Sequence, residues 1–317
     1  MDEPLVWVRA VHFAATISLT GTVLFLALIA EPVFRGTHAG GEVPARVRSW
    51  LAWIEWGSLV VVVVSGAAWL ILKAAQMGDV PWQAVFSEDL IPTVLWGTDF
   101  GQDWIARLVL AALLVPTLLA AQPARASYRP ALVAACVLGA ALVGTLAWAG
   151  HAAATTGAMG AANISSDILH LVAAAAWVGA LVPLALLLVA ALGRVDAPSI
   201  AIAREAVRRF SILGIVSVGT LVVTGVVNGL MIIGSLAVLA GTDYGRLLLF
   251  KIALFLAMLS LAAINRLWLT PLLQRQHNAD TAAILLRRIG SNTVLEAVIG
   301  VVIVAIVGVL GTMSPTE

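Results

Sequence analysis

The sequence has 317 residues, of which 61% are hydrophobic and only 11% are charged. A water-soluble domain of this length cannot bury so much apolar surface, so lipid must be the solvent for most of the chain. The composition therefore excludes an ordinary soluble protein. Membrane lipid, and not nucleic acid, is the expected neighbour of its surface.

Continuous apolar runs of about 20 residues are typical of transmembrane helices, whereas the strands of a membrane barrel alternate in polarity. The sequence contains eight such runs, so the predicted fold class is an all-α polytopic membrane protein with eight transmembrane helices. The expected spans are roughly 5–34, 50–76, 104–121, 130–150, 164–192, 208–236, 246–268 and 289–312.

The distribution of charge predicts how these helices are oriented. Most of the 18 Lys and Arg residues lie in the loops that follow the first, third, fifth and seventh runs, and the connection after the second run is acidic. Loops rich in arginine face the cytoplasm by the positive-inside rule. Both termini are therefore expected to face outward, into the periplasm.

Two apolar runs resemble each other around a histidine. His12 in the first run is followed nine residues later by Gly21, and His170 in the fifth run is followed nine residues later by Gly179. This match indicates an internal duplication. Because each copy would contain an even number of crossings, the two copies would be parallel repeats related by a pseudo-twofold axis along the membrane normal.

A second matched pair supports the duplication. Thr98–Gly101 and Thr242–Gly245 share the pattern Thr-Asp-aromatic-Gly, and each is followed six residues later by a cation, Arg107 or Lys251. Thr or Asp at the start of a helix accepts hydrogen bonds from free backbone N–H groups, so we interpret both segments as helix caps. The two predicted four-helix domains are residues 1–150 and 151–317.

His12 and His170 are the leading candidates for metal ligands. Polar side chains are costly in hydrocarbon and usually serve a function there, and neutral imidazole is the commonest protein ligand for metals. Both lie roughly 10 Å below the outer surface, at 1.5 Å per residue, as do Arg107 and Lys251. We expect the two rings to meet in a site between the repeats. The alternative for each is a structural hydrogen bond between helices.

Two further residues near the outer surface are candidate ligands. His151 follows the fourth run, and Met159 lies in the uncharged segment after it. A thioether together with imidazole suits cuprous copper better than magnesium or calcium. We therefore predict that His151 and Met159 form the entrance to the site.

Other polar residues have predicted supporting roles. Asp167 lies one helical turn before His170 and either orients its imidazole or pairs with Lys251, and Trp177 continues the same face. Glu296 lies about seven residues into the last run and is a candidate release group on the cytoplasmic side. Histidines outside and carboxylates inside is the order that a cation path into the cytoplasm requires.

Four segments resemble the copper resistance protein D (CopD) family, and the resemblance extends over essentially the whole chain. They are Asp167–Pro183, Thr98–Arg107, Asp243–Lys251 and Leu295–Ala297. The resemblance implies a bacterial inner-membrane protein that handles copper, usually by uptake from the periplasm. It also implies a partner, a separate periplasmic copper-binding protein of the CopC type.

We therefore expect a multi-pass inner-membrane protein that is not an enzyme and that moves cuprous ions from periplasm to cytoplasm. Two alternatives stay open at this point. One is an electron-transfer protein that holds haem b with His12 and His170 as axial ligands. The other is a scaffold that binds copper without transporting it.

Overall fold

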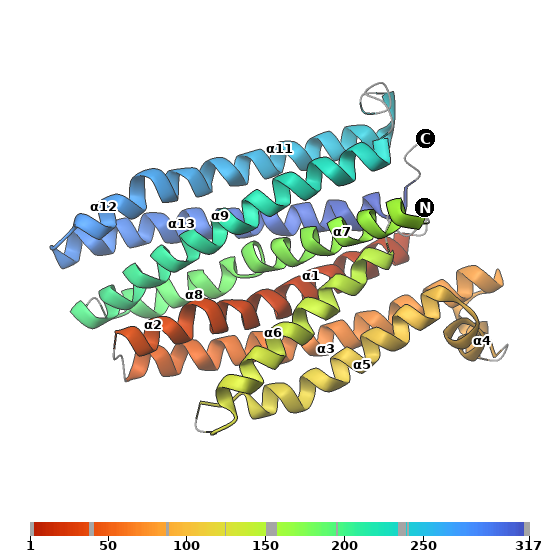
Figure 1. Cartoon of the computed structure of the whole chain (residues 1–317), viewed down its shortest axis with the longest axis horizontal. Helices are drawn as coiled ribbons and strands as arrows, with labels where there is room; N and C mark the ends of the chain where they lie inside the picture. The colour runs from red at the N-terminus through yellow and green to blue at the C-terminus, as the bar shows by residue number, and fades with distance from the viewer. Residues whose placement is uncertain are drawn as a thin grey trace.

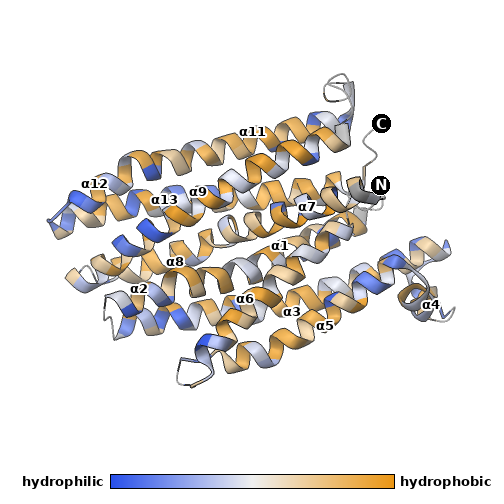
Figure 2. Cartoon of the chain, in the orientation of Figure 1, coloured by the Kyte–Doolittle hydropathy of each residue, from blue (hydrophilic) through white to orange (hydrophobic). Residues whose placement is uncertain are grey.

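The computed structural model describes residues 3–37, 41–86, 89–123, 125–149, 157–194, 196–233, 239 and 241–313. All regular structure in these residues is helical, and eight of their helices are long and apolar enough to cross a membrane. Figure 2 shows apolar residues along the middle of the long helices and hydrophilic residues near many of their ends. The predictions of an all-α membrane fold and of eight spans are confirmed.

The first four spans are built from five α-helices and two short turns of other helical types. They are α1 (Glu3–Phe25), η1 (Leu26–Ala30), α2 (Glu31–Gly36), α3 (Glu42–Gly78), α5 (Asp99–Ala120), α6 (Tyr128–Gly144) and η3 (Thr145–Ala149), with η2 (Trp82–Phe86) and α4 (Leu90–Gly97) between α3 and α5. The acidic connection after the second span thus contains helical structure of its own.

The last four spans follow the same plan. They are α7 (Gly157–Trp177), α8 (Leu181–Leu192), α9 (Ala197–Ile233), α11 (Asp243–Ile264), η5 (Asn265–Leu269), α12 (Thr270–Arg275) and α13 (Ala279–Leu310). Several helices begin about ten residues before the predicted span. An apolar run marks only the part of a helix that lies in lipid, and the polar start of the helix extends beyond it.

Two spans contain a π-helical turn directly before a proline turn. η1 precedes Glu31-Pro32, and η5 precedes Thr270-Pro271. Proline has no N–H and its ring collides with the carbonyl four residues earlier, so a wider turn relieves the clash without ending the helix. The wide turn also changes the direction in which neighbouring side chains project.

Helix pairings recur between the two groups of four spans (Figure 1). α1 packs against α3 as α7 packs against α9, and α5 packs against α6 as α11 packs against α13. Contacts across the middle match as well, because α1 packs against α13 and α7 against α6. α1 is central, since it also contacts α6 and α7.

The closest approach between the groups is at two glycines. A Cβ added to Gly21 of α1 would lie 2.5 Å from Cα of Gly179, which is in the turn between α7 and α8. A Cβ added to Gly179 would lie 3.0 Å from Cα of Gly21. In lipid, small residues at a crossing let two backbones pack directly on each other.

The predicted helix caps are confirmed. The hydroxyl of Thr98 accepts a hydrogen bond from the backbone N–H of Gly101 at 3.0 Å, and that of Thr242 accepts one from Gly245 at 3.1 Å. Each cap fixes the start of the helix, α5 or α11, that carries Arg107 or Lys251.

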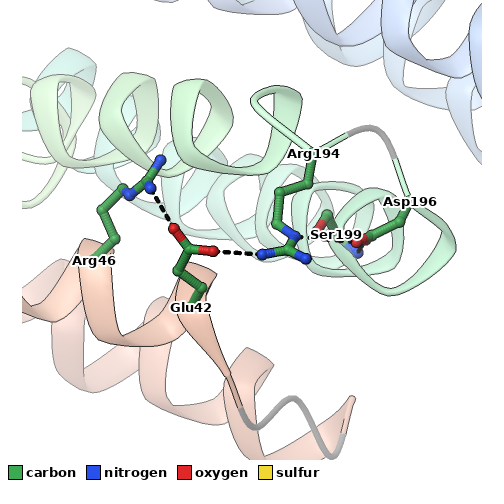
Figure 3. A network of polar contacts seen from close by, with 5 residues as sticks. All are labelled: Glu42, Arg46, Arg194, Asp196 and Ser199. Carbon is green, nitrogen blue, oxygen red and sulfur yellow. Dashed lines mark hydrogen bonds and ion pairs between the residues drawn. The ribbon is translucent and has the colours of Figure 1, made fainter.

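Figure 1 shows the start of α1, the end of α13 and α4 at one end of the bundle, and the α2–α3, α8–α9 and α12–α13 connections at the other. An exposed polar network links α3 to the α8–α9 connection at that second end (Figure 3). Glu42 accepts hydrogen bonds from Arg46 and Arg194, and Arg194 also contacts Asp196. Exposed ion pairs of this kind contribute little to stability, because water and salt screen them.

Substituting Gly21 by alanine is expected to destabilise the protein, because the new Cβ would lie 2.4 Å from the carbonyl oxygen of Ala175. Overpacking of this kind costs about 1–3 kcal/mol. The measurement is thermal unfolding of the purified protein in detergent. Gly57→Ala is the matched control, because nothing lies within 4 Å of that added Cβ. Equal melting temperatures for the two variants would contradict the close crossing.

Candidate metal centre

Each of the two histidines is hydrogen-bonded to a hydroxyl on the next span. Nδ1 of His12 lies 3.1 Å from Oγ of Ser65 in α3, and Nδ1 of His170 lies 2.9 Å from Oγ1 of Thr224 in α9. The helix pairs α1–α3 and α7–α9 therefore hold their histidines in the same way.

The hydrogen bonds of the two hydroxyls determine which ring nitrogen carries the proton. Ser65 donates to the carbonyl of Val61 at 2.5 Å, and Thr224 donates to that of Thr220 at 2.6 Å. Since each hydroxyl hydrogen is already used, each hydroxyl oxygen can only accept from the imidazole. Nδ1 is therefore the protonated nitrogen of each neutral ring, and Nε2 keeps a free lone pair. This is how a neighbouring group prepares histidine to bind a metal.

A glycine follows each of these hydroxyl residues. A Cβ added to Gly66 would lie 3.5 Å from Cε1 of His12, and one added to Gly225 would lie 3.6 Å from Cε1 of His170. Ser65-Gly66 and Thr224-Gly225 were not singled out by the sequence analysis. The signal was present, because the two pairs are separated by almost the same interval as the two histidines.

Aromatic rings surround His12. Its ring is packed edge-on against Trp69, with centroids 5.4 Å apart, and against Trp104, with centroids 5.8 Å apart. Only 1% of His12 is exposed, and its Nε2 is buried without a hydrogen-bond partner. An unpartnered lone pair inside a membrane protein is costly, so this atom is where a ligand is expected.

Two arginines lie beside the same aromatic rings. The guanidinium carbons of Arg9 and Arg107 are each 5.1 Å from the centre of the Trp69 ring. Arg107 forms an ion pair with Asp103 and donates to the side chain and the carbonyl of Thr145. The surroundings of His12 therefore carry more positive than negative charge.

The surroundings of His170 have a different charge balance. Asp167 accepts a hydrogen bond from Asn228 at 3.1 Å, and Lys251 interacts electrostatically with both Asp167 and His170. One acidic and one basic side chain thus lie near His170. The two roles predicted for Asp167, orienting the imidazole and pairing with Lys251, both stay predictions.

The described contacts do not bring the two histidines together. His12 packs within its own group of helices, and the contacts of His170 lie on α9 and near α11. The reason is helical geometry, because nine residues are two and a half turns and place His12 on the face of α1 opposite to Gly21. A single site between the halves is not supported by these contacts, and neither is one haem held by both rings.

The other predicted ligands and supporting residues include Met159, His151 and Trp177. Met159 is in the first turn of α7 and is 66% exposed, and His151 lies outside the described residues. Trp177 is 1% exposed and packs edge-on against Phe255, which makes it part of the core between the second-half helices. Among the described residues, no group of three or more His, Cys, Asp or Glu side chains is arranged to hold a metal ion.

Glu296 lies in a separate polar cluster in α13. Its side chain is almost fully buried, and Oε1 accepts a hydrogen bond from Asn265 at 3.0 Å. Asn265 in turn accepts one from Asn292 at 2.8 Å. Asn265 is the first residue of the π-helical turn η5, so the wide turn positions the amide that holds this carboxyl group.

The protonation pattern of the histidines can be measured by nitrogen NMR of the metal-free protein. Both His12 and His170 are expected to carry their proton on Nδ1 while neutral, because Ser65 and Thr224 can only accept. Ser65→Ala and Thr224→Val remove the acceptor and should give mixed tautomers at the corresponding ring only. A proton on Nε2 in the wild-type protein would show that the hydroxyls do not control the tautomer.

Comparison with known proteins supports a family assignment. The sequence model of the copper resistance protein D-like N-terminal domain matches residues 1–161, and that of copper resistance protein D matches residues 204–310. Copper resistance protein D of Pseudomonas syringae pv. tomato is 32% identical, over 99% of this chain and 98% of that protein. No solved structure matches the chain.

Two further relatives are similar. Inner membrane protein YebZ of Escherichia coli is 30% identical over 97% of both chains. Copper transport protein CutJ of Bacillus subtilis is 35% identical over 58% of this chain and 33% of that protein. The resemblance expected from the four sequence segments is confirmed. The chain belongs to the copper resistance protein D family, and it is a multi-pass protein of the inner membrane.

Proposed function

We propose that this protein carries copper ions across the inner membrane, from the periplasm to the cytoplasm, and catalyses no chemical reaction. The observation that carries the proposal is the matched pair of imidazoles, each with Nδ1 held by a hydroxyl and Nε2 left to bind a metal. Imidazole is a suitable copper ligand, and the relatives' names connect this family with copper resistance and copper transport.

We further propose two copper sites, one in each group of four helices, in place of one site between them. The contacts of His12 and His170 with different helices support this arrangement. The site at His170 suits a cation better, because Asp167 offsets Lys251 there, whereas His12 lies beside Arg9 and Arg107.

The proposed topology is two parallel four-helix repeats, residues 1–150 and 151–317, with both termini in the periplasm. The recurring helix pairings, the two threonine caps and the matched histidine contacts support the repeat. The arginine-rich loops support the orientation, since such loops remain in the cytoplasm. In this orientation the histidines lie in the outer part of the membrane.

The second half provides the proposed route inward. Met159, which is exposed, and His151 would receive the cuprous ion, His170 would bind it, and Glu296 would receive it on the way to the cytoplasm. Glu296 is buried and is linked by hydrogen bonds to Asn265 and, through it, to Asn292. A buried carboxyl group is costly inside a membrane, so its presence supports a functional role. A periplasmic copper-binding protein of the CopC type would deliver the ion.

Copper flux into proteoliposomes tests the proposal. His170→Ala should reduce flux at least tenfold, because it removes the ligand in the route, as loss of even an outer partner of a ligand costs 10–100-fold. His277→Ala is the matched control, because that histidine is exposed in the loop before α13 and should leave flux unchanged.

Binding measured alongside flux separates a carrier from a scaffold. Glu296→Gln should slow flux and leave copper binding at His170 intact, since Glu296 hydrogen-bonds Asn265 and not the histidine. Copper binding with no flux in the wild-type protein would favour the scaffold. A Soret absorption band in the purified protein would instead favour haem binding.

A further inference from the structure

Four buried nitrogen atoms around Trp69 have no hydrogen-bond partner in the part of the chain that the structure describes. They are Nε of Arg9, Nε2 of His12, Nε1 of Trp104 and Nη1 of Arg107. Three of the four, those of the arginines and the tryptophan, can only donate. Leaving one buried donor unpaired is unfavourable, and more so when the group is charged. Three together at one place indicate that something accepts from them.

The charges at this place do not balance. Arg9 is 9% exposed and Arg107 is 2% exposed, and the carboxylate of Asp103 pairs with Arg107. The other described contacts of the arginines are with neutral groups, the carbonyl of Ala149 and the side chain and carbonyl of Thr145. Among the described residues, one positive charge is thus buried without a negative partner, and an uncompensated charge inside a membrane protein is strongly unfavourable.

The second half lacks this excess. Three residues before its histidine, the first half has Arg9 and the second half has Asp167. Three residues before its helix cation, Arg107 or Lys251, the first half has Trp104 and the second half has Leu248. The indole donor and one of the two cations are therefore particular to the first half. A ligand that needs them would bind there and not at the equivalent place near His170.

We propose that a small monovalent anion of the halide class binds in the first half, held by the N–H groups of Arg9, Trp104 and Arg107. One negative charge balances the excess, and the donors satisfy an ion that only accepts hydrogen bonds. The side chains that would hold the anion are almost completely buried, so bulk water does not screen their charge. The anion would also offset the positive charge beside Nε2 of His12.

Chloride binding to the copper-free protein tests this site independently of copper transport. Thermal unfolding is measured as chloride replaces gluconate at constant ionic strength, together with equilibrium binding of radiolabelled chloride. Chloride is expected to raise the melting temperature saturably and to bind at one equivalent per chain. Equal melting temperatures in the two salts, with no bound chloride, would show that water satisfies the donors and would overturn the proposal.

Variants locate the site. Trp104→Phe keeps the aromatic packing but removes one donor, and it should weaken chloride binding by about tenfold, as expected for loss of a hydrogen bond to a charged group. Trp268→Phe is the control, because Trp268 is 65% exposed and far along the chain from the site. Arg9→Gln should abolish the chloride effect. Unchanged chloride affinity in folded Trp104→Phe and Arg9→Gln would place the anion elsewhere and refute the assignment.

Discussion

The arrangement of the site depends on one type of hydrogen bond, from a serine or threonine hydroxyl to a carbonyl of its own helix. Inside lipid no water competes for this bond, so the hydroxyl continues to donate its hydrogen to the carbonyl. Ser65 and Thr224 can then only accept from an imidazole, and Nε2 of each histidine is left unprotonated. The resulting hydrogen bond from Nδ1 of each histidine to its hydroxyl joins two helices and leaves Nε2 able to bind a metal. A polar group that is costly in the membrane serves both packing and function.

The two halves keep this device but surround it with different charges. Near His12 the arginines lie over the Trp69 ring, whereas near His170 an acidic and a basic side chain are both present. Two halves with similar helix pairings and different charges can take different ligands. The proposed anion in the first half and the proposed cation route in the second both rest on this difference.

Much of the fold could be predicted from sequence, because apolar runs identify the part of each helix in lipid and Thr98 and Thr242 mark two helix starts. The polar extensions of α3, α9 and α13 could not be predicted, since hydropathy identifies only the part of a helix that lies in lipid. The histidines were identified because charge-bearing groups are rare in hydrocarbon. The expected meeting of the two rings finds no support in the described contacts, and the nine-residue spacing from His12 to Gly21 places these two residues on opposite faces of α1. The tautomer required the structure, because it depends on contacts between helices.

The copper content of single-histidine variants tests the central claim most directly. Elemental analysis of the copper-loaded protein is compared between the wild type, His12→Ala and His170→Ala. If each imidazole binds its own ion, each variant loses one of two copper ions and retains the other. Loss of all copper from either single variant would mean that the two rings share one ion, and it would contradict separate sites in the two halves.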